Sequence, residues 1–177
     1  NRSVVFLVIY FASRISRLVM NDLAGTLTVL ILFLSPFFLG HAMNNPKDIP
    51  FASSYIMAIW FIIQLFERLP HARKTDYLWA ILSIGATINI RVGGILLIPY
   101  LFVFAFLVYI VRSKFRKEDV KLFAYLKPIL ITGALGYLCG SLLWPYGLKN
   151  PIQNPLTALS EMSNFKVNIR QLFEGEK

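Results

Sequence analysis

Long apolar runs alternate with short polar stretches along the whole chain, and their lengths are typical of transmembrane helices. A helix needs about 20 apolar residues to cross a bilayer, and fewer where the membrane thins locally. The pattern predicts about six spans, at residues 4–15, 22–40, 50–66, 77–89, 95–111 and 127–144. The expected fold class is therefore all-α, a polytopic transmembrane helical bundle.

Helix-start and helix-stop residues mark the ends of several spans. The Asn-Asp pair at 21–22 offers a side-chain oxygen that favours a helix start, and the Ser-Pro pair at 35–36 predicts a kink. The Trp-Pro-Tyr run at 144–146 is typical of an interfacial aromatic belt followed by a helix stop. Residues 1–147 are thus predicted to form the transmembrane region.

Composition and charge support a membrane protein. Hydrophobic residues make up 56% of the 177-residue chain, the mean hydropathy is +0.61, and only 15% of residues are charged, against about 25% in soluble domains. The net charge of +9 gathers in short loops between spans, which is a topology signal, so we expect no nucleic-acid partner. The chain starts inside an apolar run, and we interpret it as an internal piece of a longer protein.

The basic residues predict the orientation of the bundle. Alternate loops on one side hold most of them, namely Arg14, Arg17, Arg68, Arg73, Lys74, Arg112, Lys114, Arg116, Lys117, Lys121 and Lys127. The opposite side holds only Arg2, Lys47 and Arg91 before the tail. The positive-inside rule places the richer side in the cytoplasm. Residues 35–50, the turn at Arg91 and the C-terminal tail are then expected together on the outer face.

Residues 35–50, expected to be a short loop at the membrane rim, contain the main candidates for chemistry. They are His41, Asn44, Asn45, Lys47 and Asp48. Polar, irregular chain at membrane depth must line protein or a watery cavity. Asp48 could act as a general base, orient one, or ligate a divalent ion such as Mg²⁺ or Mn²⁺. It could equally be the N-cap of a helix that begins at Pro50.

The other candidates also have two interpretations. His41 could bind a metal or substrate, or serve as a hydrogen-bonded anchor. Lys47 could hold a lipid phosphate or extend its ammonium to water. Arg91 precedes a Gly-Gly pair at 93–94. Its guanidinium suits bidentate contact with the phosphate of a donor lipid, or with ordinary headgroups.

Residues 148–177 are predicted to be an extracytoplasmic loop with a short amphipathic helix at about 155–164. Its apolar face would consist of Leu156, Leu159, Met162 and Phe165. Such a helix could cover a substrate groove or lie at the membrane interface. The lone Cys139 is expected to serve packing. The sequence has no nucleotide-binding glycine motif, Cys/His metal motif or nucleophile elbow.

Three segments together, at 35–50, 89–99 and 144–165, resemble multi-pass glycosyltransferases of the GT-C fold. The family is the dolichyl/polyprenyl-phosphate-mannose protein mannosyltransferase-like family (family 39), in its bacterial branch. The first segment, Ser-Pro-Phe-Phe-Leu-Gly-His-Ala-Met-Asn-Asn-Pro-Lys-Asp-Ile-Pro, fits the pattern Pro-x-x-x-Gly-His…Pro-Lys-Asp-x-Pro that members of this branch often show.

The resemblance implies an inverting transferase on the outer face of a bacterial plasma membrane. It would pass a sugar from a polyprenyl-phosphate carrier to an acceptor hydroxyl on protein, lipid or glycan. A second outer-loop acid maps onto Asp48, and a basic residue near the donor phosphate maps onto Arg91, where relatives often carry Lys. The usual catalytic base belongs to an earlier outer loop, expected before Asn1, so the fragment alone should be inactive. Some relatives use a divalent metal.

Two other functions fit the alternating spans. One is a transporter or lipid flippase in which Asp48 and Arg91 line a pathway, and the other is a membrane scaffold without chemistry. A transporter is expected to carry ionisable residues near the middle of its spans, and these spans are nearly free of them. In a scaffold, Asp48 would only cap a helix.

Overall fold

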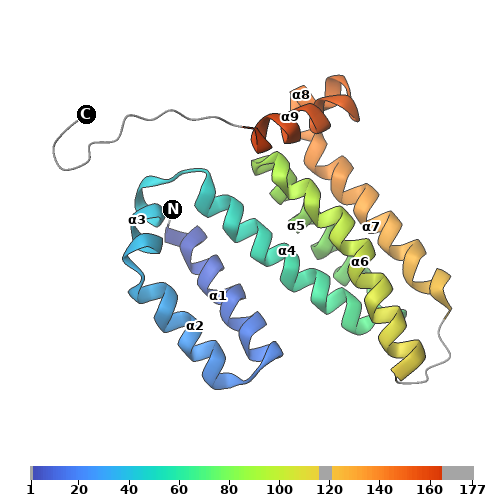
Figure 1. The fold of residues 1–177 in the computed structure, drawn as a ribbon, viewed down its shortest axis with the longest axis horizontal. Helices are drawn as coiled ribbons and strands as arrows, with labels where there is room; N and C mark the ends of the chain where they lie inside the picture. The colour runs from blue at the N-terminus through green and yellow to red at the C-terminus, as the bar shows by residue number, and fades with distance from the viewer. Residues whose placement is uncertain (1, 116–120, 165–177) are drawn as a thin grey trace.

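The computed structural model describes residues 2–115 and 121–164, and the regular structure in these ranges is helical (Figure 1). The predicted all-α class is therefore confirmed. In chain order the elements are α1 (Arg2–Val19), α2 (Asp22–Leu34), α3 (Pro36–Asn44), α4 (Asp48–Arg68), α5 (Lys74–Ile90), the 3-10 turn η1 (Val92–Leu96), α6 (Leu97–Ile110), the π-helical turn η2 (Val111–Phe115), α7 (Leu122–Leu142), α8 (Pro145–Lys149) and α9 (Gln153–Ser163).

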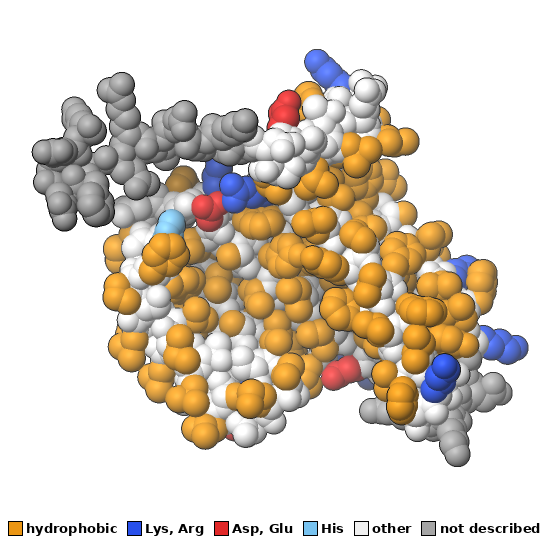
Figure 2. Space-filling model, in the orientation of Figure 1, with side chains coloured by type: hydrophobic (Ala, Val, Ile, Leu, Met, Phe, Trp, Pro, Cys, Tyr) orange, Lys and Arg blue, Asp and Glu red, His pale blue; other side chains and the backbone are white. Residues whose placement is uncertain are grey.

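Helices α4, α5, α6 and α7 form the main bundle, α1 packs beside it against α4, and α2 packs against α1 (Figure 1). The core lies where α4, α5, α6 and α7 meet, and its fully buried side chains include Leu65, Ile84, Leu101 and Ile129. Large apolar side chains also cover the outside of the bundle (Figure 2). An apolar exterior around a packed core suits a protein that is surrounded by lipid.

The α5–α7 contact depends on small residues. A Cβ on Gly140 would lie 2.7 Å from Cβ of Ile88, and one on Gly85 would lie 2.9 Å from Cβ of Cys139. Larger residues would force the two helices apart, and close approach through small residues is how membrane helices gain van der Waals contact. Cys139 thus packs against α5, as its isolated position in the sequence predicted.

The prediction of a loop over residues 35–50 was wrong, because α3 and the start of α4 occupy most of that stretch and only 45–47 lie outside a helix. The prolines begin helices here. Pro36 is the first residue of α3, and Pro50 lies in the first turn of α4, where a missing N–H costs nothing. The predicted kink is real: α2 and α3 meet at 63° around Ser35.

Three helical stretches are long and apolar enough to cross a membrane: α4, the continuous run from η1 to η2, and α7. The bent pair of α2 and α3 would make a fourth within the described ranges. The helices extend a few residues beyond most of the apolar runs, into polar ends such as 67–68 and 74–76. The count of six spans stays a prediction.

Figure 1 shows that the start of α4, the turn η1, and helices α8 and α9 lie at one end of the bundle, which we call the site end. The α4–α5 connection, at residues 69–73, lies at the opposite end together with the end of α6. The predicted convergence of polar segments at one end is therefore present. The side that faces the cytoplasm stays a prediction, and Arg116, Lys117 and Phe165 lie outside the described residues.

Candidate active site

An ion pair joins Asp48 and Arg91 at the site end, although the two residues are 43 positions apart in the sequence. Nη1 of Arg91 donates to Oδ1 of Asp48 at 2.5 Å. Asp48 is the first residue of α4, Arg91 directly follows α5, and these two helices pack against each other. An antiparallel pair brings the start of one helix to the end of the next. Both side chains are nearly half exposed, at 46% and 47%.

Asp48 does not cap its own helix, which corrects the alternative left open by the sequence. The N-cap position belongs to Lys47, whose side chain makes no capping bond. The capping oxygen comes from Asn45, whose Oδ1 accepts the backbone N–H groups of Asp48 at 2.9 Å and of Lys47 at 3.1 Å. The Asp48 carboxylate receives hydrogen bonds only from side chains within the described part of the chain.

Asn45 connects the carboxylate to the histidine. Its Nδ2 donates to Oδ2 of Asp48 at 2.6 Å and lies 3.4 Å from Nδ1 of His41. The His41 ring in turn tilts against Phe37, with ring centroids 4.4 Å apart. One amide side chain therefore fixes the rotamer of the carboxylate and links α3 to α4. The bonds make Asn45 a positioning residue for Asp48.

The turn after α5 holds Arg91 in place through close backbone contacts. A Cβ on Gly94 would lie 2.7 Å from the Ile88 nitrogen and 2.8 Å from the Thr87 carbonyl oxygen, so only glycine fits at this position. The Arg91 guanidinium lies over the Phe51 ring, 6.0 Å from its centroid, which is within the range of a cation–π contact.

Helix α9 lies against the same turn. A Cβ on Gly93 would lie 3.3 Å from Cε of Met162 and 3.6 Å from Cζ of Phe51. The α9 helix was predicted at 155–164, close to its observed bounds, but Leu156 is 61% exposed, so it does not share the contact face of Met162. Asn154 lies inside α9, and its amide donates to the Tyr146 carbonyl at 2.6 Å.

Of the six residues predicted to form a site, the structure links four by hydrogen bonds or close polar contact: His41, Asn45, Asp48 and Arg91. Asn44 lines an open hollow together with His41 and Asn45. Lys47 is exposed, and its role toward a phosphate stays a prediction. In the described ranges no three His, Cys, Asp or Glu side chains gather where they could hold a metal ion, and the Mg²⁺ or Mn²⁺ expectation also stays a prediction.

Comparison with known families now identifies the chain. Residues 3–138 match the model of the family described as dolichyl-phosphate-mannose-protein mannosyltransferase. The chain belongs to this family. No curated protein and no solved structure gives a significant match.

Membership makes the protein a membrane glycosyltransferase of the mannosyltransferase type, and the apolar helices agree with an integral membrane location. The family implies a lipid-linked sugar donor and an acceptor. The matched region includes the Asp48–Arg91 pair and its Asn45 and His41 partners. Helices α8 and α9 lie beyond it.

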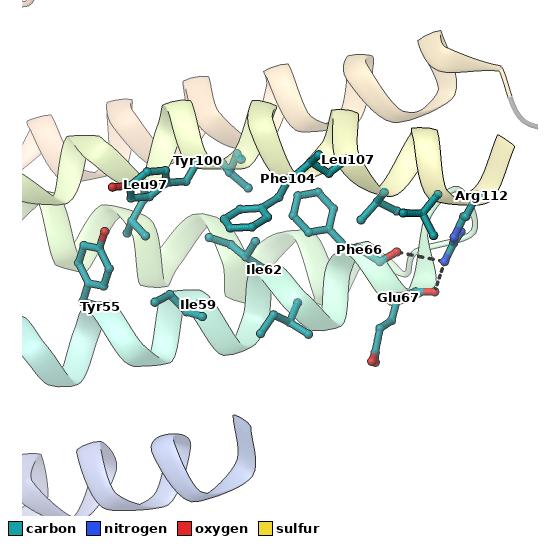
Figure 3. A pocket seen from close by; sticks show the side chains of 14 residues that line it. Tyr55, Ile59, Ile62, Phe66, Glu67, Leu97, Tyr100, Phe104, Leu107 and Arg112 are labelled. Carbon is teal, nitrogen blue, oxygen red and sulfur yellow. Dashed lines mark hydrogen bonds between the residues drawn. The ribbon is translucent and has the colours of Figure 1, made fainter. Parts of the chain in front are cut away.

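The sequence reasoning missed an apolar groove between α4 and α6. Its volume is about 810 Å³. Tyr55 and Tyr100 lie at the end of the groove nearer the site end, and Glu67 and Arg112 lie at the other (Figure 3). The Phe51 ring lies 5.5 Å from that of Tyr55, so aromatic side chains connect the groove to Arg91. The i, i+4 spacing of Phe51 and Tyr55 was the available signal, but the partner helix α6 was not predictable from it.

Proposed function

We propose that this chain carries part of the active site of an inverting glycosyltransferase that takes a sugar from a polyprenyl-phosphate carrier and passes it to an acceptor hydroxyl. The acceptor belongs to a protein, lipid or glycan, and the reaction takes place on the outer face of a bacterial plasma membrane. One observation carries the proposal. A half-exposed carboxylate and a guanidinium meet about two helical turns beyond the Tyr55 end of an apolar groove, in a chain of the mannosyltransferase family.

Each side chain has a distinct task in this reaction. The bond between the sugar's anomeric carbon and the phosphate oxygen breaks, and its electron pair stays on the polyprenyl phosphate. Arg91 stabilises that developing negative charge, because a fixed cation is worth most where charge appears in the transition state. The acceptor oxygen forms the new bond to the anomeric carbon, and Asp48 takes the acceptor proton.

The groove explains how the donor reaches these groups. A polyprenyl chain is apolar and belongs in the membrane, whereas its phosphate is charged and belongs at the membrane surface. The groove follows α4 toward Tyr55, about two helical turns from Asp48, since each turn rises about 5.4 Å. A chain lying in the groove would place its phosphate beside Arg91. Asn45 keeps Asp48 oriented while Arg91 changes partner from the carboxylate to the phosphate.

Replacement of Asp48 by Asn in the full-length protein tests the assignment. Asn keeps the shape of the side chain but cannot accept the proton, so transfer from polyprenyl-phosphate-mannose should fall by about 10²–10⁴-fold, the usual contribution of a general base. The matched control is Asp22→Asn, which changes an acid that is 96% exposed at the opposite end. Wild-type turnover by Asp48→Asn would remove Asp48 from the catalytic site.

A further inference from the structure

A second recess adjoins the ion pair through Asn45, which lines it and also bonds Oδ2 of Asp48. It is an open hollow of about 420 Å³ lined by Pro36, Phe37, Gly40, His41, Asn44 and Asn45. All six lining residues lie on α3 or directly adjoin it. The hollow is therefore formed by α3 and the residue that follows it.

The hollow combines an aromatic ring with side-chain hydrogen-bonding groups. Phe37 is 77% exposed, and its ring packs against His41. The Asn44 amide is exposed and has no hydrogen-bond partner among residues 2–115 and 121–164. An amide offers two donors and one acceptor, and imidazole offers one of each. The recess can therefore pair with several hydroxyl groups and with one apolar face of a ligand.

Asn45 forms the wall between this hollow and the carboxylate. Its Nδ2 donates to Oδ2 of Asp48 at 2.6 Å, while Oδ1 of Asp48 faces Arg91. The two oxygens of one carboxylate thus face different surroundings, one cationic and one next to the hollow. A ligand seated in the hollow would place its hydroxyl groups close to the base, and a phosphate on the opposite side would meet the guanidinium.

From this arrangement we infer that the hollow binds a hexose ring. A pyranose has one C–H-rich face that packs on an aromatic ring, since the face of that ring carries negative charge, and a rim of hydroxyls that bond amides and imidazole. Phe37 supplies the ring, and Asn44 and His41 supply the polar groups. The ring can belong to the donor's sugar or to a sugar of the acceptor. The role given to the hollow in catalysis rests on the proposed function, whereas the binding experiment tests the hollow independently of that function.

Binding can be measured without turnover. The probe is methyl α-D-mannopyranoside at millimolar concentration, followed by saturation-transfer NMR on the full-length protein in a detergent that has no sugar headgroup. We expect saturation transfer to the pyranoside protons in the wild type and none to sorbitol, an open-chain polyol. Asn44→Ala and Phe37→Ala should each weaken binding by about five- to tenfold, the effect of a lost hydrogen bond or ring contact.

The matched control is Met43→Ala, because Met43 precedes Asn44 on the same helix, is 80% exposed and does not line the hollow. It should bind the pyranoside like the wild type. Equal binding by wild type, Asn44→Ala and Phe37→Ala would overturn the inference, and so would a wild-type protein that gives no saturation transfer.

One further measurement shows whether the hexose belongs to the donor or to the acceptor. Another tests the hollow and the proposed function separately. In steady-state transfer assays, Asn44→Ala should raise KM and spare kcat. A rise in the KM for polyprenyl-phosphate-mannose assigns the hollow to the donor sugar, whereas a rise in the KM for a glycan acceptor assigns it to the acceptor. Asp48→Asn should lose transfer and keep pyranoside binding. Normal transfer by Asp48→Asn together with normal pyranoside binding would refute the catalytic role of Asp48, and the hollow would still be assigned as a hexose site.

Discussion

The same two helices, α4 and α5, carry an arginine–aspartate bridge at each end, and the two bridges differ in burial. At the site end, Asp48 and Arg91 are both nearly half exposed. At the opposite end, Arg68 is also half exposed, but its partner Asp76 is only 8% exposed. Both bridges connect one end of α4 to one end of α5. The pairing alone therefore cannot distinguish a structural bridge from a catalytic one.

The hydrogen bonds around each aspartate make the distinction. Both carboxylate oxygens of Asp76 accept hydrogen bonds that hold the fold together. Oδ1 accepts from Arg68, and Oδ2 accepts the backbone N–H of Arg73 at 2.9 Å in a capping box. Asp48 receives bonds from two side chains and from no backbone group. Side-chain partners can exchange for a substrate, whereas the backbone of a helix end cannot. The comparison indicates that the Asp76 bridge fastens the helices and that the Asp48 bridge is free to take part in chemistry.

Arg112 makes the opposite end more rigid still. This arginine, in η2, donates to the backbone carbonyls of Leu69, Glu67 and Phe66, with the Glu67 bond at 3.0 Å, and to the Tyr125 hydroxyl at 2.8 Å. The C-terminal carbonyls of a helix have no partners within it, so one guanidinium both completes the end of α4 and joins it to α7. Among the described residues at the site end, no arginine makes a comparable set of bonds to helix-end carbonyls.

Among the variants that test the comparison of the two bridges, the largest effect is expected at Arg91. Arg91→Ala removes the cation that would face the leaving phosphate, so kcat should fall by about 10²–10³-fold, corresponding to about 2.7–4 kcal/mol of transition-state stabilisation. Arg91→Lys keeps the charge and should recover part of the rate, although it loses the planar bidentate geometry. The thermal unfolding midpoint should change little, because an exposed bridge contributes about 0–1 kcal/mol. A large loss of stability with unchanged turnover of the folded fraction would reverse the comparison of the two bridges.

The second-largest effect is expected at Asp76, where stability should fall and activity should not. Asp76→Ala leaves Arg68 without its partner and removes the acceptor for the Arg73 N–H, so we expect a loss of about 2–3 kcal/mol of stability, typical of charge-assisted hydrogen bonds. The measurement is the thermal unfolding midpoint in detergent, with transfer activity normalised to folded protein. Normalised activity should stay close to the wild-type value. A specific loss of kcat at unchanged stability would show that the opposite end also takes part in the reaction.

Sequence patterns predicted most of the helices and the presence of Asp48 and Arg91 at one end of the bundle, because both depend on local chemistry and on counting spans. The Asn-Asp start of α2 is a clear case: Oδ1 of Asn21 accepts the Ala24 N–H at 2.9 Å. The approach of Asp48 to Arg91 also followed from the alternation of spans. Neither inference required knowledge of how each helix is rotated about its own axis.

The details that distinguish the two bridges do depend on rotation and rotamers, so the sequence could not supply them. Asn45 was named only as one of several candidates for chemistry, and its bond to the neighbouring carboxylate was not predicted. Asp76 fell outside the predicted span, which began at residue 77, whereas α5 begins at Lys74. The apolar groove between α4 and α6 joins residues from separate helices, such as Tyr55 and Tyr100. No local sequence pattern predicts which residues of two separate helices line the same groove.

The smallest expected effect tests how far the backbone of the Arg91 turn sets the geometry at the site end. In Gly94→Ala the new Cβ would lie 2.7 Å from backbone atoms of α5, and backbone cannot move aside, so the turn must shift at a cost of about 1–3 kcal/mol. In the matched variant Gly93→Ala the nearest atom is the flexible methyl end of Met162, at 3.3 Å, which can give way. We therefore expect Gly94→Ala to lower both the unfolding midpoint and kcat, and Gly93→Ala to change each far less. If both variants retain wild-type kcat, the position of Arg91 does not depend on this turn, and the site end tolerates more movement than its contacts indicate.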